Sequence, residues 1–155
     1  MRLRKSRALA CALLTAWAAT FGPILSRTAA QGGLNTLGVE FISAAELKEK
    51  LTKGERLTLI DLRTANLYAS SDGKVSGAIH IKERRLRARL GMPPLRDAPR
   101  DAEVVTYCAC PNDEAAVRAA HTLSAAGFKR VRVLKGGWRA WLDARGPVEA
   151  KPRGL

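Results

Sequence analysis

Short runs typical of buried strands alternate with helical stretches from residue 38 onward, and this alternation restricts the fold more than any other feature. The strand signals fall at 56–61, 78–81, 103–107 and 130–134. The helical signals fall at 43–51, 64–70, 82–90, 113–126 and after Gly136-Gly137. Strands that alternate with helices pair in parallel, because each helix carries the chain back to the starting edge of the sheet. The pattern predicts one α/β domain over residues 38–150, with a central, mostly parallel sheet flanked by helices.

Local signals support two of these helices. Ser43 followed by Glu46 has the spacing of a capping box, and Leu47 and Leu51 then lie on one helical face. In the later helix, four apolar residues recur at helical spacing: Ala116, Val117, Ala120 and Leu123. Each helix therefore has one face suited to packing on a sheet.

The composition fits one globular domain and excludes a disulfide-rich scaffold. The chain has 155 residues, 46% of them hydrophobic, and only three cysteines. A chain of this length can bury a sizeable core without cross-links, and three cysteines cannot form a lattice of disulfides. The formal net charge is +13. Residues 1–30 contribute five of these positive charges and no acid: Arg2, Arg4, Lys5, Arg7 and Arg27.

The first 30 residues have the features of an export signal. A basic cluster precedes a run from Ala8 to Leu25 with almost no polar side chain, and small residues follow where a signal peptidase recognises its substrate. We expect a secretory signal peptide cleaved near Ala30 and an exported, periplasmic protein. The alternative is that residues 8–25 remain uncleaved as a membrane anchor, since about 18 apolar residues can just span a bilayer. A membrane contact is expected only in that case.

The residues with the clearest chemistry lie at 107–114, where a strand ends and a helix begins. At the carboxyl edge of a parallel sheet, such a loop directs backbone N–H groups and the positive end of a helix dipole toward its centre. The sulfur of Cys108 is the candidate for that position. These surroundings lower the pKa of a thiol and favour the reactive thiolate. From the residues alone, Cys108 is either a nucleophile or a small buried residue at a strand end.

A series of segments along the chain matches one known pattern. They are Ile42-Ser43, Leu59-Ile60-Asp61-Leu62-Arg63, the run from Gly73 to Ile81, Val104 to Cys108, Ala126-Gly127-Phe128 with Val131 and Leu134, Gly136-Gly137-Trp138 with Trp141, and Gly146-Pro147-Val148. Each segment is a weak signal, and their order and spacing make the combination specific. With these segments the chain resembles the rhodanese-like (sulfurtransferase) domain family over almost its whole length after residue 30.

This resemblance implies a single doubly wound α/β domain in which Cys108 is the catalytic residue. The cysteine would accept a sulfane sulfur as a persulfide and pass it to a thiol or another nucleophile, which is covalent catalysis in two half-reactions. The implied partners are a small sulfur donor and a thiol or protein acceptor. No cofactor is implied.

The loop departs from the pattern Cys-x-x-Gly-x-Arg-Ser that is common in the family. Pro111 stands in the place of the glycine, Asp113 in that of the arginine and Glu114 in that of the serine, while Ala109 and Asn112 complete the loop. An arginine would help to bind thiosulfate, whereas two carboxylates repel a dianion. We therefore expect a donor other than, or in addition to, thiosulfate. Both acids also suit the first turn of a helix, where carboxylates stabilise the dipole.

Cys110 leaves further functions open. It can form a disulfide with Cys108, resolve a persulfide or sulfenate formed there, or only pack beneath the loop. The alternatives to a sulfurtransferase are a thiol redox protein that uses both cysteines and a catalytically silent rhodanese-like binding module. A related phosphatase would need an arginine six residues after the cysteine, where Glu114 stands. No metal site is expected, because only His80 and His121 accompany the cysteine pair.

The segment Lys-Glu-Arg-Arg-Leu-Arg-Ala-Arg at 82–89 is strongly basic. Helical cations commonly face water, but a cluster of them also attracts anions. If this segment borders the Cys108 loop, Arg84 or Arg85 could supply the positive charge that the loop lacks. Nucleic acid is not an expected partner, because an exported protein rarely meets it.

Overall fold

A computed structural model describes residues 38–152 of the chain. The signal peptide or anchor expected at residues 1–30 lies outside the described residues. The strands are β1 (Glu40–Ile42), β2 (Leu57–Asp61), β3 (Gly73–Val75), β4 (Ile79–His80), β5 (Glu103–Tyr107), β6 (Arg130–Leu134) and β7 (Val148–Ala150). The helices are α1 (Ala44–Thr52), α2 (Ala65–Ala69), α3 (Leu86–Arg89), α4 (Glu114–Ala125) and α5 (Gly137–Asp143), with 3-10 turns η2 (Glu83–Arg85) and η3 (Pro111–Asp113).

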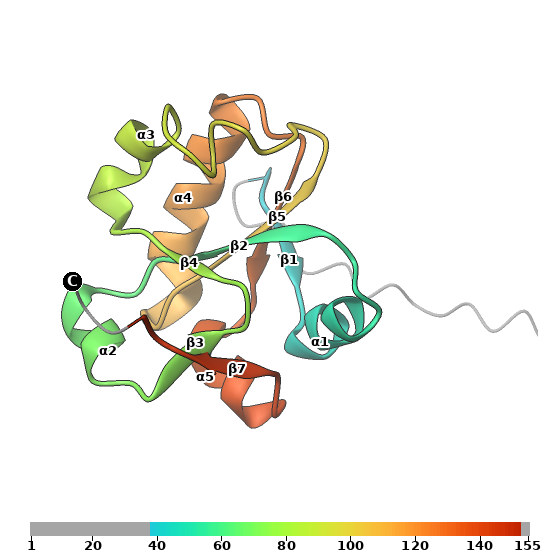
Figure 1. Ribbon diagram of the computed structural model, residues 1–155, viewed down its shortest axis with the longest axis vertical. Coiled ribbons are helices and arrows are strands. Elements are labelled where there is room, and N and C mark those ends of the chain that lie inside the picture. Colours follow the sequence, from blue (N-terminus) through green and yellow to red (C-terminus); the bar gives the residue numbers. More distant parts are fainter. Residues whose placement is uncertain (1–37, 153–155) are drawn as a thin grey trace, which may run out of the picture. The chain divides into compact units, whose positions relative to one another are not determined.

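Five of the strands form one parallel sheet in the order β1-β6-β5-β2-β4 (Figure 1). The predicted α/β class and its mostly parallel sheet are confirmed. β5 lies at the centre, so its carboxyl end opens between the ends of β6 and β2. The short strands β3 and β7 pair antiparallel as a separate ribbon.

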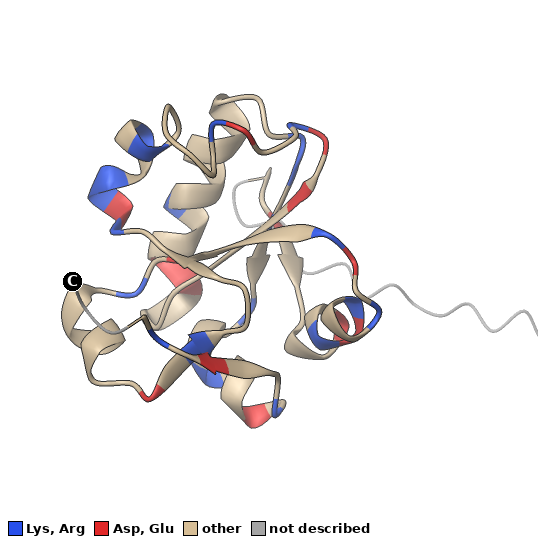
Figure 2. Ribbon diagram, viewed as in Figure 1, with Lys and Arg blue, Asp and Glu red and all other residues tan. Residues whose placement is uncertain are grey.

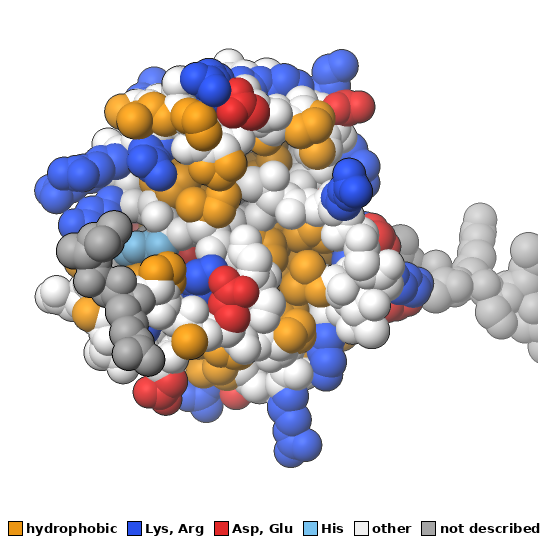
Figure 3. All heavy atoms as spheres, in the orientation of Figure 1, with side chains coloured by type: hydrophobic (Ala, Val, Ile, Leu, Met, Phe, Trp, Pro, Cys, Tyr) orange, Lys and Arg blue, Asp and Glu red, His pale blue; other side chains and the backbone are white. Residues whose placement is uncertain are grey.

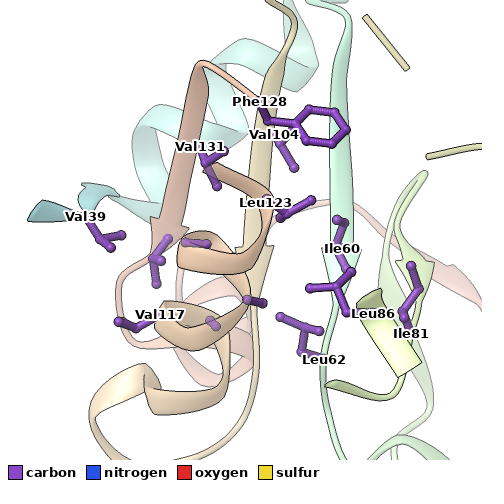
Figure 4. Packing of buried hydrophobic residues seen from close by; sticks show 14 of the residues in the cluster. Val39, Ile60, Leu62, Ile81, Leu86, Val104, Val117, Leu123, Phe128 and Val131 are labelled. Carbon is purple, nitrogen blue, oxygen red and sulfur yellow. The ribbon is translucent and has the colours of Figure 1, made fainter. Parts of the chain in front are cut away.

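Each face of the sheet has its own hydrophobic core, because neighbouring residues of a strand point to opposite faces. Val104 of β5 packs with the residues of α3 and α4, and Figure 4 shows Val117 and Leu123 of α4 in this cluster. The next residue, Val105, lies in the other core, with buried side chains of α1 and α5 that include the fully buried Trp141. Because β5 is covered on both faces, all five of its residues are buried, including the polar Glu103 and Thr106.

The predicted capping box at the start of α1 forms only in part. Ser43 Oγ accepts a hydrogen bond from the backbone N–H of Glu46 at 3.1 Å. The carboxylate of Glu46 does not return to Ser43. It binds the Arg132 guanidinium at 2.6 Å instead, so it connects α1 to β6. A charged partner on the adjacent strand therefore replaces the reciprocal backbone hydrogen bond.

The helix predicted over 82–90 is interrupted. The structure has the 3-10 turn η2 followed by the short α3, and Arg85, the last residue of η2, has φ −98° and ψ −4°. Neither piece has a side-chain cap, and Leu86 is the only buried residue in them. One apolar anchor and a series of like charges are too little to hold a continuous helix on the core.

Three short strands, β1, β3 and β7, were not predicted from the sequence. Gly73 begins β3, opposite Ala150 in β7. A side chain at Gly73 would overlap Val148 and the backbone of Glu149, so the two strands can approach only with glycine there.

Candidate active site at the Cys108 loop

The loop that carries the cysteines leaves the carboxyl end of β5 and enters α4 through η3 (Figure 1). Cys108 is 1% exposed and belongs to the core shared with α4, whereas Cys110 is half-buried. The remaining loop residues Ala109, Pro111 and Asn112 are exposed. The two sulfur-bearing residues therefore differ in access, although only one residue separates them.

Cys108 and Cys110 are joined in a disulfide, with their Cα atoms 5.7 Å apart. The backbone N–H of Cys110 donates to Cys108 Sγ at 3.4 Å. The backbone N–H of Ala115, in the first turn of α4, donates to Cys110 Sγ at 3.4 Å. The amide at the start of the helix thus faces Cys110, and not Cys108 as the sequence analysis expected.

Asp113 has a different place from the one expected for it. Asn112 and Asp113 both adopt left-handed backbone conformations, with φ of 55° and 56°. Asp113 is buried, and its Oδ2 accepts a hydrogen bond from the backbone N–H of Gly136 at 2.7 Å. Burial raises the pKa of this carboxyl, and the Gly136 hydrogen bond opposes the rise. Asp113 therefore attaches the loop to the turn before α5, while Glu114 alone is an acid in the first turn of α4.

A cavity of about 450 Å³ lies beside the loop. Cys110 lines it, together with the charged residues Arg63, Lys82, Glu83, Arg84, Glu114 and Arg118. Cys108 and Asp113 are not among the lining residues. The structure thus brings Cys110 and Arg84 to one cavity. Arg85 lines a separate cavity with His80 and Arg89.

Arg118 is a residue of this cavity that the sequence analysis missed. Its guanidinium binds Glu83 through two hydrogen bonds of 3.1 Å, and lies 3.8 Å from Glu114. The Glu83 hydrogen bonds raise the pKa of Arg118. Arg118 lies one helical turn after Glu114, and that spacing is the only signal that could have placed it near the loop.

A buried ionic network holds the base of the site. Arg63 and Asp61 are both fully enclosed, and Arg63 Nη2 donates to Asp61 Oδ2 at 2.6 Å. The hydroxyl of Tyr107 donates to the same carboxylate oxygen at 2.8 Å. The guanidinium of Arg63 also lies 4.2 Å from the ring centroid of Trp138. Burial raises the pKa of Tyr107, which therefore stays a hydrogen-bond donor. This network joins the ends of β2 and β5 to the start of α5.

His80 has a structural place in the same region. Its ring stacks on that of Tyr68 with the centroids 3.8 Å apart, and its Nε2 lies 2.9 Å from the carbonyl oxygen of Arg63. Within residues 38–152, no group of three or more potential metal ligands occurs. In the same range, no helix is long and apolar enough to cross a membrane.

Fold and site together define an α/β protein with a cysteine-bearing loop at the carboxyl edge of a parallel sheet. A model of the rhodanese-like domain family matches residues 43–144. The chain belongs to this family. Among curated proteins, none matches the chain.

Several solved structures are similar to this chain. The Alr3790 protein from Anabaena sp. is 31% identical, with 71% of this chain and 82% of that chain covered and a TM-score of 0.59. BH2092 from Bacillus halodurans is 27% identical, with 71% of this chain and 76% of that chain covered and a TM-score of 0.60. RPA3614 from Rhodopseudomonas palustris is described as a protein of unknown function and possible tyrosine phosphatase. It is 28% identical, with 72% of this chain and 85% of that chain covered and a TM-score of 0.58.

Proposed function

We propose that the protein is a sulfurtransferase that carries sulfane sulfur as a persulfide on Cys108. The observation that supports this most is the position of Cys108, directly after the central strand β5 and at the start of the loop that leads into α4. In a family that includes sulfurtransferases, this is the position of the catalytic cysteine. We place the protein outside the cytoplasm, in the periplasm, on the basis of the N-terminal sequence.

The chemistry needs two displacements at sulfur. The Cys108 thiolate attacks the outer sulfur of a donor, forming a sulfur–sulfur bond while the rest of the donor leaves with the electron pair. A thiolate acceptor then attacks the outer sulfur of the persulfide, and Cys108 leaves as a thiolate. The backbone N–H of Cys110, at 3.4 Å from Cys108 Sγ, can stabilise that thiolate in both steps.

Positive charge for an anionic donor comes from outside the loop. Lys82 and Arg84 line the cavity beside Cys110, and Arg118 lines it although its charge is shared with Glu83. Of the two loop acids, only Glu114 lines this cavity, since Asp113 turns toward Gly136. The repulsion of an anionic donor is therefore weaker than two exposed carboxylates would cause.

The test is the mass of the full chain, reduced and then exposed to thiosulfate or a polysulfide. We expect the gain of one cyanide-removable sulfur atom, located on Cys108 by peptide fragmentation. Cys108→Ser should abolish the gain, whereas Cys110→Ser should retain part of it. Sulfur uptake by the first variant would contradict the assignment of Cys108.

A thiol redox function is the second candidate, because the disulfide joins the two cysteines of the loop. In that case, the reduced protein would pass electrons to a disulfide substrate and take up no sulfur. Hydrolysis of a phosphate ester is not expected, although one similar protein is described as a possible phosphatase. Position 114, where a phosphatase loop needs arginine, holds an exposed carboxylate that repels phosphate.

A further inference from the structure

The two sulfurs of the disulfide are not equally open to attack. Cys108 is 1% exposed and packs in the core against α4. Cys110 is half-buried and lines the cavity, and Cys108 does not line it. A thiolate that enters the cavity therefore meets Cys110 first. Exchange requires attack along the sulfur–sulfur bond, so access decides which sulfur reacts.

The cavity continues into a second hollow between α3 and α4. This hollow has a volume of about 520 Å³, and it shares Glu83, Arg84 and Arg118 with the first cavity. It extends to Arg87 on α3 and to His121 on the exposed face of α4. We call the two hollows together the α3–α4 groove. One end of this groove therefore has a sulfur, and the other end is basic.

The charges of the groove favour an anion. Lys82, Arg84 and Arg87 have no ion-pair partner within the described part of the chain, whereas Arg118 is paired with Glu83. Figure 2 shows Lys and Arg positions gathered along the segment around α3. Figure 3 shows a gathering of Lys and Arg side chains over the same segment. Unpaired cations along a hollow concentrate negatively charged ligands there.

We propose that the α3–α4 groove binds a thiol that carries carboxylates, and that this thiol opens the disulfide by attack on Cys110. The thiolate forms a bond to Cys110 Sγ, the bond between Cys110 and Cys108 breaks, and its electron pair leaves on Cys108. A second thiolate then attacks the incoming sulfur of the mixed disulfide. The products are the oxidised thiol and Cys110 thiolate, so two thiols supply the two electrons that the protein disulfide accepts.

The local hydrogen bonds oppose this direction of attack, but only weakly. The Ala115 N–H at Cys110 Sγ would stabilise Cys110 as the leaving thiolate, which favours attack at Cys108. Cys108 has a similar donor in the Cys110 N–H, also at 3.4 Å. The two leaving groups are thus nearly balanced in hydrogen bonding, and access to the sulfur determines the outcome. The inference rests on the proposed function, since it supplies the reduced Cys108 that sulfur transfer requires.

The experiment follows opening of the disulfide in the full chain without any sulfur donor. The oxidised protein is mixed with glutathione, quenched with acid, and alkylated, and the alkylated residue is located by peptide fragmentation. We expect the first alkylated thiol to be Cys108, with glutathione on Cys110. The opposite placement would overturn the proposal. Sulfur uptake by the reduced protein is measured separately. Failure of the proposed attack on Cys110 is then distinguishable from failure of the proposed sulfur transfer by Cys108.

Variants test the groove. The exposed pair Arg84→Ala with Arg87→Ala should slow opening by glutathione about fivefold, while opening by the neutral thiol 2-mercaptoethanol should stay near the wild-type rate. The matched control is Arg56→Ala. Arg56 is an exposed arginine directly before β2, at the amino-terminal ends of the strands, whereas the cysteine loop lies at their carboxyl ends. An equal loss with both thiols, or an equal loss in the control, would contradict a groove that selects carboxylates.

A second pair of probes distinguishes a small thiol from a peptide. One probe is a short cysteine peptide with flanking aspartates, and the other has lysines in their place. If the acidic peptide opens the disulfide faster than glutathione and depends more on Arg87, the ligand is a protein segment. If the acidic peptide is no faster than glutathione but still faster than the basic peptide, the ligand is a small thiol. Equal rates for the two peptides would overturn the proposal.

Discussion

Gly137 lies against the carbonyl oxygen of Cys108, so closely that a Cβ atom at Gly137 would overlap this oxygen and its carbonyl carbon. The next residue, Trp138, donates its backbone N–H to the same oxygen at 2.8 Å. The start of α5 is thus fastened to the first residue of the cysteine loop. Gly137 also has a φ of +49°, a backbone conformation that suits glycine.

Gly137→Ala should therefore destabilise the protein and disturb the loop. We expect the free energy of unfolding to fall by about 2–4 kcal/mol, because backbone strain adds to steric overlap with Cys108. The control is Gly54→Ala, which has a φ of +71° but no atom within 4 Å of its Cβ position. That variant should lose only about 1 kcal/mol. Equal losses in urea unfolding would contradict a specific contact with Cys108.

Asp113→Asn should change how stability depends on pH. Burial raises the pKa of Asp113 in the folded protein above its ordinary value of 3.8, so the folded state holds this proton more tightly than the unfolded state. Its contribution to stability is therefore greatest at acid pH, and it is lost as the pH rises through the folded pKa. Asparagine keeps an oxygen for the Gly136 N–H without this titration. In urea unfolding, the stability of the wild type relative to the variant should fall from acid to neutral pH. A difference that stays constant with pH would contradict the desolvation of Asp113.

Arg63→Leu tests the buried ionic network. The substitution leaves the carboxylate of Asp61 enclosed without its counter-ion, which costs about 3–5 kcal/mol. The control is Arg139→Leu, which removes an exposed pair with Asp143 on α5 and should cost less than about 1 kcal/mol. Chemical unfolding at neutral pH measures both. Similar small losses would mean that water reaches Asp61.

The sequence predicted the parts of the fold that carry strong local patterns. β5 and α4 are predictable because a short β-branched strand and a repeated apolar helical face can each be recognised within one segment. β1, β3 and β7 have three residues each, and their pairing depends on partners far along the chain. The interruption at Arg85 likewise follows from how little of the 82–90 segment the core anchors.

The candidate site was predictable at its cysteines and not in its surroundings. Cys108 lies where a predicted strand meets a predicted helix, so its position at the sheet edge could be read from the sequence. The spacing of Cys110 does not say which sulfur faces the cavity. That depends on the left-handed turn at Asn112 and Asp113, which neither residue type requires. Arg118 reaches the cavity through tertiary packing, which the sequence pattern does not contain.

Reduction of the disulfide should have little effect on stability, which separates a chemical role from a structural one. The covalent ring encloses only Cys108, Ala109 and Cys110, so it removes little conformational entropy from the unfolded chain. Loop-closure entropy for three residues corresponds to about 1.6 kcal/mol. We expect a loss of this size or less when a phosphine reduces the protein, measured by urea unfolding of the oxidised and reduced forms. Global unfolding on reduction would contradict a disulfide that opens and closes during function, since each opening would then destroy the groove that the incoming thiol needs.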